Sequence, residues 1–211
     1  MALPLSGIIL ASGEGSRMRQ LSEQLHLPKH LFPLGPTSVV GRLIKQMQGL
    51  CQEILVITSP PHASVFKQHL ASISSAVPLR LEVKQASGFR GDFMAMAAAT
   101  HPQLLLTMGD LVFSNQILAT LAAQKATNVI AIDRTTSLHF DFRILGGKIE
   151  KELLLQLKEI NPESFWPMFR LVTQQIWHRK GKIIFLPSLF NLNTPAAYQK
   201  AVEYFRQHPT D

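Results

Sequence analysis

The sequence predicts an α/β fold in which helices cover both faces of a largely parallel β-sheet. Short, mostly apolar segments typical of strands recur along the chain, and between them lie segments with apolar residues at positions i, i+3 and i+4. Regular alternation of this kind is typical of βαβ units, whose strands run parallel. Ligands of such sheets bind at the carboxyl ends of the strands. Residues that directly follow a predicted strand are therefore the candidates for a functional site.

The first predicted strand is the segment Ile8 to Ala11. It is apolar at every position and stops at Ser12-Gly13, as expected for a strand that is buried on both faces. Four more strands of this kind are predicted at residues 53–58, 79–83, 104–108 and 129–132. The helical pattern occupies residues 39–50, 62–73, 92–100 and 114–126.

The pattern changes after Asp133. The segments 140–144 and 148–149 flank the pair Gly146-Gly147, and this arrangement predicts a β-hairpin.

The last quarter of the chain predicts one strand and two helices. The strand is expected at residues 183–186 and the helices at residues 163–179 and 195–206. Thr194 and Pro195 match an N-cap residue followed by proline at the first helical position. Three aromatic side chains in the first of these helices are expected to lie in or over the core rather than to form a stacking platform: Trp166, Phe169 and Trp177.

The composition predicts a single domain that spans residues 1–211. The chain has 46% hydrophobic and 17% charged residues, which suffices for a buried core and does not match a disordered chain. Its one cysteine, Cys51, excludes an internal disulfide framework. The start lacks the pattern of a signal peptide, and no apolar run approaches the ~18–20 residues of a membrane span. We expect a soluble cytoplasmic protein with no membrane partner.

The net charge of +7, with eight histidines counted as neutral, suggests an anionic partner. The lysines and arginines are scattered along the chain, and the longest basic run is His178-Arg179-Lys180. Aromatic residues do not interleave with a basic patch as they do in proteins that bind single strands. An anionic small molecule explains the charge equally well, so we expect no nucleic-acid partner.

A glycine-rich loop follows the first strand. Gly13 and Gly15 allow positive φ angles, so that successive backbone N–H groups can face an anion. Arg17 and Lys29 add positive charge, and the combination suits the phosphates of a nucleoside triphosphate. On the spacing alone, a plain structural turn is an equally good interpretation. A dinucleotide fingerprint is excluded because Met18 stands where its third glycine is required, and a Walker loop is excluded because Gly-Lys-Ser/Thr is missing.

Asp110 is the second candidate for chemistry. The sequence Met108-Gly109-Asp110 closes the strand predicted at residues 104–108, which places this carboxylate at the same sheet edge as the glycine-rich loop. Mg²⁺ prefers one or two carboxylates together with phosphate oxygens and water. The alternative is a turn or N-cap aspartate ahead of the helix that starts near Ser114. Position alone does not separate the two.

Several of these segments together resemble a known family. The segment LASGEGSRM at residues 10–18, followed by Pro28-Lys29 and LFPLG, is similar to the signature of nucleotidyltransferases that join a nucleoside triphosphate to a phosphorylated acceptor, such as the sugar-1-phosphate nucleotidyltransferases. Three further segments fall in the family's order, namely MGD at 108–110, DFRILGGKI from Asp141 and FNLNTPAAY from Phe190. The resemblance implies a three-layer α/β/α, Rossmann-like nucleotidyltransferase fold with a mostly parallel mixed sheet.

The late motif resembles two subgroups. Sugar-1-phosphate enzymes usually carry a sequence like DxGTPEDY, whereas molybdenum cofactor guanylyltransferases carry NxNTPEDL, and the segment from Asn191 to Pro195 has the second form. The N-terminal motif, with its spacer between Arg17 and Lys29, is closer to the sugar group.

The resemblance implies roles for individual residues. The loop would hold the base and the triphosphate through Leu10, Ala11, Ser12, Gly13, Glu14, Gly15 and Ser16. Arg17 and Lys29 would be the catalytic cations that neutralise phosphate charge, and Asp110 would hold Mg²⁺. Asn191 falls where the sugar enzymes place a second metal carboxylate, and Asn193 would contact the substrate in a guanylyltransferase-like arrangement.

Four further candidates rest on weaker signals. Gln85, just after a predicted strand, is a candidate for reading the base, with a surface glutamine as the alternative. Gly91 is a candidate nucleotide contact, although Asp92 follows it where the sugar enzymes commonly show threonine. Asp133 and Asp141 are candidates for the acceptor site, with turn residues as the alternative.

The expected function is Mg²⁺-dependent transfer of a nucleoside monophosphate from a nucleoside triphosphate to a phosphorylated acceptor, with release of pyrophosphate. A sugar 1-phosphate is the leading acceptor, which would place the chain in sugar nucleotide biosynthesis. The alternatives are a molybdenum cofactor guanylyl- or cytidylyltransferase and a member of the same fold that binds nucleotide without turnover. The sequence leaves the oligomeric state open, a homo-oligomer included.

Overall fold

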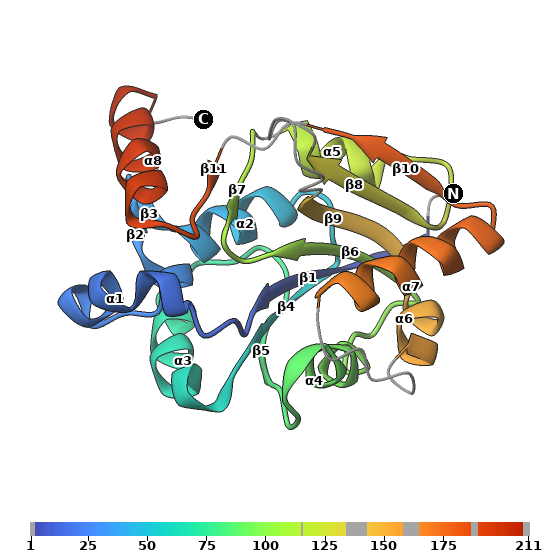
Figure 1. The fold of residues 1–211 in the computed structure, drawn as a ribbon, viewed down its shortest axis with the longest axis horizontal. Coiled ribbons are helices and arrows are strands. Elements are labelled where there is room, and N and C mark those ends of the chain that lie inside the picture. The colour runs from blue at the N-terminus through green and yellow to red at the C-terminus, as the bar shows by residue number, and fades with distance from the viewer. Residues whose placement is uncertain (1–2, 115, 134–142, 158–164, 187–189, 209–211) are drawn as a thin grey trace.

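A seven-stranded mixed sheet forms the centre of the protein in the computed structural model, which describes residues 3–114, 116–133, 143–157, 165–186 and 190–208 (Figure 1). The strand order is β10-β8-β9-β6-β1-β4-β5, and every neighbouring pair is parallel except those that include β9. In chain order the strands of this sheet are β1 (Leu5–Ala11), β4 (Glu53–Thr58), β5 (Leu79–Val83), β6 (Gln103–Met108), β8 (Val129–Asp133), β9 (Arg143–Glu150) and β10 (Lys182–Phe185). The predicted mostly parallel mixed sheet is confirmed.

Helices cover both faces of this sheet, because side chains alternate along each strand. Ile9 of β1 packs into one core with α2, α3 and α5, whereas its neighbour Ile8 packs into a second core with α4, α6 and α7. On the first face lie α2 (Val39–Met47), α3 (Ala63–Ala71) and α5 (Gln116–Ala122). On the second lie α4 (Gly88–Met96), α6 (Lys151–Leu157) and α7 (Phe165–His178). The three-layer α/β/α prediction is confirmed.

A third group of elements lies beyond the carboxyl end of β1, on the left of Figure 1. Met18, Phe32, Leu192 and Phe205 form a separate buried cluster there. The elements of this group are η1 (Ser16–Met18), α1 (Arg19–Leu25), η2 (Lys29–Leu31), β2 (Pro33–Leu34), β3 (Thr37–Ser38), β7 (Leu111–Val112), β11 (Phe190–Asn191) and α8 (Pro195–Gln207). A short turn, η3 (Pro60–His62), precedes α3. This cluster packs the segment after the glycine-rich loop against the late motif.

The hairpin predicted around Gly146-Gly147 is wrong. Both glycines lie inside the continuous strand β9, which pairs antiparallel with β6 on one side and with β8 on the other. A Cβ at Gly146 would lie 2.3 Å from the carbonyl oxygen of Leu106, and one at Gly147 would lie 2.8 Å from that of Val129. The glycines therefore mark a close approach of strands rather than a turn. Residues 140–142 of the predicted hairpin lie outside the described residues.

Two other expectations need correction. Trp177 is 78% exposed and does not cover the core, while the side chains of Trp166 and Phe169 lie outside the described ones. The helix predicted at 92–100 begins earlier, at Gly88, and ends at Met96.

The predicted cap of the last helix is confirmed, because the side chain of Thr194 accepts a hydrogen bond from the amide of Ala197 at 3.2 Å. None of the described helices has the length and apolar character needed to cross a membrane.

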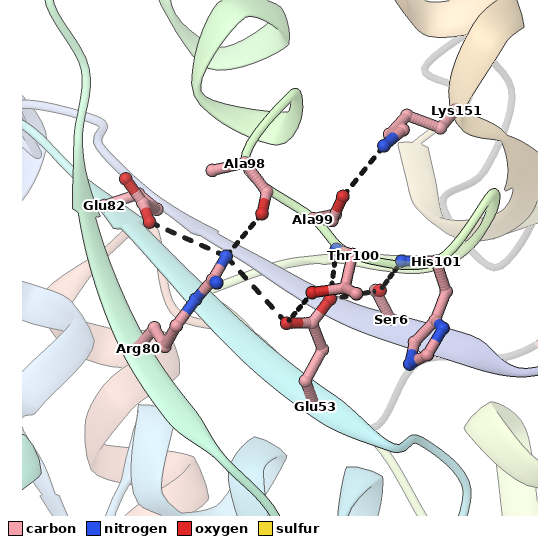
Figure 2. Close-up of polar contacts among 9 residues, drawn as sticks. All are labelled: Ser6, Glu53, Arg80, Glu82, Ala98, Ala99, Thr100, His101 and Lys151. Atoms are coloured by element: carbon pink, nitrogen blue, oxygen red, sulfur yellow. Dashed lines mark hydrogen bonds and ion pairs between the residues drawn. The ribbon is translucent and has the colours of Figure 1, made fainter.

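A buried carboxylate holds the amino end of the sheet together (Figure 2). Glu53 of β4 accepts hydrogen bonds from the Ser6 hydroxyl at 2.6 Å, from the Thr100 hydroxyl at 3.0 Å and from the Thr100 amide. Arg80 of β5 lies 3.8 Å from the same carboxylate and donates to the carbonyl oxygen of Ala98. Burial by itself raises the pKa of Glu53, but these hydrogen bonds and the charge of Arg80 together lower that pKa below its ordinary value. The network joins β1, β4, β5 and the loop before β6.

The lowered pKa predicts a pH-dependent contribution of Glu53 to stability. A carboxyl group with a depressed pKa in the folded state stabilises the protein above its unfolded pKa of about 4.3, and this contribution is lost as the pH falls through the folded value. We expect Glu53→Gln to reduce the free energy of unfolding by about 1–3 kcal/mol at pH 7, and the difference from wild type to shrink below pH 4. Urea unfolding across this range measures it. Glu82→Gln, which removes a more exposed carboxylate beside the same arginine, is the control, and a pH-independent difference contradicts the assignment.

Candidate active site

The carboxyl ends of β1 and β6 meet through a backbone hydrogen bond. The amide of Gly109 donates to the carbonyl oxygen of Leu10 at 2.7 Å. A Cβ at residue 109 would lie 2.9 Å from that oxygen and 3.1 Å from the Cβ of Ala11, so only glycine allows this approach without a shift of the backbone. The contact places Asp110 directly beside the start of the glycine-rich loop, as the sequence predicts.

Of the two glycines in the loop, Gly15 has a positive φ angle, whereas Gly13 does not. The φ of Gly15 is 66°, in the left-handed region, and a Cβ at this position would lie 3.3 Å from Cδ of Lys29. The loop therefore folds against the stem of that lysine. Arg17 follows in η1 with an exposed side chain and makes no ion pair within the described part of the chain. Its guanidinium is thus available to an anion that binds at the loop.

Lys29 is the centre of the site. Its ammonium nitrogen Nζ lies 2.6 Å from Oδ2 of Asp110 and 2.6 Å from Oδ1 of Asn193, and its side chain is only 7% exposed. Burial by itself raises the pKa of Asp110, but the charge of Lys29 and the hydrogen bond that it donates lower that pKa below its usual range. The ion pair therefore keeps an ionised carboxylate in a largely buried position.

The late motif joins the site through backbone and side-chain contacts. β11 pairs antiparallel with β7, directly after Asp110, and the amide of Leu192 donates to the carbonyl oxygen of Asp110 at 2.9 Å. The side-chain amide of Asn193 donates to Oδ1 of Asn191. Asn193 rather than Asn191 shares the Lys29 ammonium with Asp110, while Asn191 lies one contact further away. Residues 81 and 164 positions from Lys29 in the sequence thus converge on its Nζ.

These oxygens are of the kind that Mg²⁺ binds. The Asp110 carboxylate and the Asn193 amide oxygen both contact the Lys29 ammonium, and the Asn191 amide oxygen accepts a hydrogen bond from Asn193. Mg²⁺ in phosphate sites uses one or two carboxylates together with phosphate oxygens and water. Among the described residues, no three His, Cys, Asp or Glu side chains form a cluster that could hold a metal by themselves. A metal at Asp110 would therefore need ligands from the bound phosphates.

A cavity of about 240 Å³ opens beside this cluster. Its wall contains Asp110 and Lys29 together with Leu10, Ser12 and Gly13 of the loop, and it continues to Lys84, Phe89 and Asp92. A larger hollow of about 760 Å³ lies between α3 and β5, but none of the predicted site residues lines it. The smaller cavity is the one that the glycine-rich loop and the carboxylate share, so it is the candidate ligand site.

The structure adds residues that the sequence analysis left without a role. Lys84 follows β5, and Phe89 lies in the first turn of α4. His30 also lines the cavity; burial, and then the charge of Lys29, lowers its pKa to about 3, so its imidazole is neutral. The adjacency of His30 to Lys29 was the only signal for it in the sequence, whereas Lys84 and Phe89 become neighbours of the loop only through the sheet order.

Most of the other predicted candidates lie outside the wall of this cavity, namely Ala11, Glu14, Gly15, Ser16, Arg17, Gln85, Gly91, Asp133, Asn191 and Asn193. Gln85 is exposed, and its side-chain amide donates to the carbonyl oxygen of Val83 at 3.1 Å. Gly91 lies in α4, where a Cβ would lie 1.9 Å from the carbonyl oxygen of Ala86. Asp133 is buried at the end of β8, so the alternative of a turn residue is wrong for it. Two strands separate Asp133 from β1, and Asp141 lies outside the described residues.

Known proteins resemble this chain in sequence and in fold. The family model described as "MobA-like NTP transferase domain" matches residues 7–160. The bifunctional protein GlmU of Kineococcus radiotolerans is 31% identical over 144 residues, which cover 66% of this chain and 28% of that protein. The chain spans less than half the length of the curated GlmU proteins that it matches.

Two solved structures share the fold over nearly their whole length. A nucleotidyl transferase from Methanothermobacter has a TM-score of 0.74 at 16% identity, with 97% of this chain and 99% of that chain covered. The inositol-1-phosphate CTP transferase from T. maritima has a TM-score of 0.70 at 14% identity, with 98% of each chain covered. At such identities the likeness concerns the fold alone, and it confirms the predicted Rossmann-like nucleotidyltransferase fold.

The buried ion pair predicts a specific effect of removing its cation. In Lys29→Met the Asp110 carboxylate keeps its burial without its counter-ion, so its folded pKa rises above the unfolded value of about 3.9. We expect the free energy of unfolding to fall by about 2–4 kcal/mol at pH 7, and the loss to grow as the pH rises from 4 to 6 and the carboxyl group ionises. Urea unfolding of Lys29→Met, Asp110→Asn and the double variant measures it. If the double variant recovers none of the loss, the pairing is not its cause.

Proposed function

The chain belongs to the MobA-like NTP transferase family, and from this premise and the site geometry we propose that it transfers a nucleoside monophosphate from a nucleoside triphosphate to a phosphorylated acceptor. A sugar 1-phosphate is the proposed acceptor, and pyrophosphate is the proposed leaving group. The observation that carries the proposal is the convergence of Asp110 and Asn193 on the ammonium of Lys29 at the mouth of a glycine-rich loop.

The loop and its cations suit a triphosphate. Gly15 takes a left-handed conformation, which in anion-binding loops lets successive backbone N–H groups face an anion, and Arg17 is exposed nearby. Lys29 has three N–H donors, of which Asp110 and Asn193 use two. The third donor is available for a phosphate oxygen. The loop amides, the Arg17 guanidinium and the Lys29 ammonium can therefore contact the phosphates while Lys29 keeps its hydrogen bonds to Asp110 and Asn193.

The proposed reaction needs no catalytic nucleophile from the protein. An oxygen of the acceptor phosphate forms a bond to the α-phosphorus, and the bond between that phosphorus and the oxygen bridging to the β-phosphorus breaks. The electron pair of the broken bond leaves with pyrophosphate. Arg17 and Lys29 stabilise the charge that develops on the leaving group, and the cavity wall holds the reactants in line. Bound to Asp110 and the asparagine oxygens, Mg²⁺ would supply further neutralisation of phosphate charge.

A second acceptor class rests on a separate observation. Asn191 and Asn193 replace the carboxylate and glycine usual in the late motif of sugar enzymes, and they are hydrogen-bonded to each other beside Lys29. This favours a molybdenum cofactor nucleotidyltransferase as the alternative. A third alternative, nucleotide binding without turnover, rests on the neutral amide at residue 191, because an amide oxygen binds Mg²⁺ less strongly than a carboxylate.

A panel of donors and acceptors separates these functions. Pyrophosphate release is measured for each nucleoside triphosphate with sugar 1-phosphates, choline phosphate and molybdopterin, in Mg²⁺. We expect release with one or more sugar 1-phosphates. Release with molybdopterin alone favours the second acceptor class. Measurable nucleotide binding without release in any combination contradicts both enzyme functions and favours the third alternative.

Asp110→Asn tests the proposed metal site. We expect kcat/KM to fall by a factor of roughly 100 or more, because the variant loses the only carboxylate in contact with Lys29 among the described residues. The Mg²⁺ concentration for half-maximal activity should also rise. Glu203→Gln, which removes an exposed carboxylate of α8, is the matched control. An unchanged Mg²⁺ response in Asp110→Asn places the metal elsewhere.

A further inference from the structure

Asp92 is a buried carboxylate in the wall of the candidate ligand cavity. It lies in α4, is 5% exposed, and faces the cavity together with Ser12, Phe89 and Lys84. Carboxylates are seldom buried to this extent unless they are paired or hydrogen-bonded. The proposed transfer chemistry at Lys29 and Asp110 gives Asp92 no task, so its position calls for a separate explanation.

The two oxygens of Asp92 differ in their surroundings. Oδ1 accepts a hydrogen bond from the hydroxyl of Ser12 at 2.6 Å, and the ammonium of Lys84 lies 3.8 Å from the same oxygen. Oδ2 has no hydrogen-bond partner in the described part of the chain. Burial raises the pKa of Asp92, against the opposing effects of the Ser12 hydrogen bond and the Lys84 charge. Ser12 and Lys84 therefore hold the carboxylate in place by one oxygen and leave the other as an acceptor.

Sheet order decides which part of a nucleotide meets this oxygen. Asp110 follows β6 and Lys84 follows β5, and β1 and β4 lie between them. Three strand spacings separate the two ends of the cavity by roughly 14 Å. Lys29, and Gly15 that packs against its stem, lie at the Asp110 end and suit phosphates. The nucleobase consequently belongs toward the β5 side, where Phe89 of α4 lines the wall beside Asp92 and offers apolar surface for a ring.

We propose that Asp92 makes this cavity select a nucleobase that carries an exocyclic amino group, as adenine, cytosine and guanine do, over uracil and thymine. This inference rests on the proposed binding of a nucleoside triphosphate. An amino group donates a hydrogen bond to Oδ2, which accepts none from the described residues. Uracil and thymine carry one ring N–H flanked by two carbonyl oxygens, and those oxygens repel a carboxylate. A base that covers this charged oxygen without donating a hydrogen bond to it, or that places a second acceptor against it, is disfavoured.

The wild-type protein tests this directly. Dissociation constants for ATP, CTP, GTP, UTP and dTTP are measured by calorimetry in Mg²⁺ at pH 8, which favours the ionised carboxylate. We expect at least one amino-bearing nucleotide to bind roughly tenfold or more tightly than both UTP and dTTP, and the three separate arms identify which base it is. Binding of UTP or dTTP as tight as that of all the others overturns the inference and leaves the proposed function intact. Failure of all five to bind contradicts the proposed function itself.

Asp92→Asn tests the residue. The amide keeps an acceptor oxygen for Ser12 and places an N–H donor at the position of Oδ2. We therefore expect the difference in affinity between the amino-bearing nucleotides and UTP or dTTP to become smaller, or to reverse in favour of UTP and dTTP. Glu82→Gln is the matched control, because it removes a carboxylate of strand β5 that lies outside the cavity wall, and it should keep the wild-type ranking. Thermal melting shows whether each variant is folded. If Asp92→Asn is folded and ranks the five nucleotides by affinity as the wild-type protein does, Asp92 does not set the base preference. If the variant does not fold, the dissociation constants of the wild-type protein decide the question.

Discussion

The ion pair between Lys29 and Asp110 is the interaction on which the site depends. Its two side chains come from η2 and from the end of β6, and neither could remain charged in a largely buried position without the other. Asn193 completes the arrangement from a third segment. Because the ammonium is shared by oxygens from distant parts of the chain, the pair connects the glycine-rich loop, the central sheet and the late motif. The same ion pair therefore neutralises the buried charges of the site and holds these three segments together.

Backbone approach explains why glycines surround this pair. Gly109 lies close enough to the carbonyl oxygen of Leu10 that a side chain there would require the strand ends to move apart. Gly15 takes a left-handed conformation against the stem of Lys29. At the opposite edge, Glu53 gathers hydrogen bonds from β1 and from the loop before β6. The sheet is thus held at both ends, with a stabilising carboxylate at one end and a charged, ligand-accessible cluster at the other.

The cavity has two chemically distinct ends. At the Lys29 end, a cation is balanced by one carboxylate and has a donor left over. At the Asp92 end, a carboxylate is balanced by Lys84 and has an acceptor left over. A nucleoside triphosphate has the complementary order, with negative charge at one end and hydrogen-bond donors on some of its bases at the other. This complementarity connects the proposed transfer function to the proposed base preference.

The sequence by itself determined the features that depend on neighbouring residues. Apolar runs predicted the strands β4 and β5 at their observed bounds, Thr194 predicted the cap of α8, and the spacing of Gly13, Gly15 and Asp110 predicted a loop and a carboxylate at one sheet edge. Tertiary structure decided the rest. Gly146-Gly147 reads as a turn locally, but strand pairing on both sides makes it the middle of β9. The sharing of Lys29 between Asp110 and Asn193, and the position of Asp92 beside Ser12, follow from strand order, which places residues 80 or more positions apart within hydrogen-bond distance.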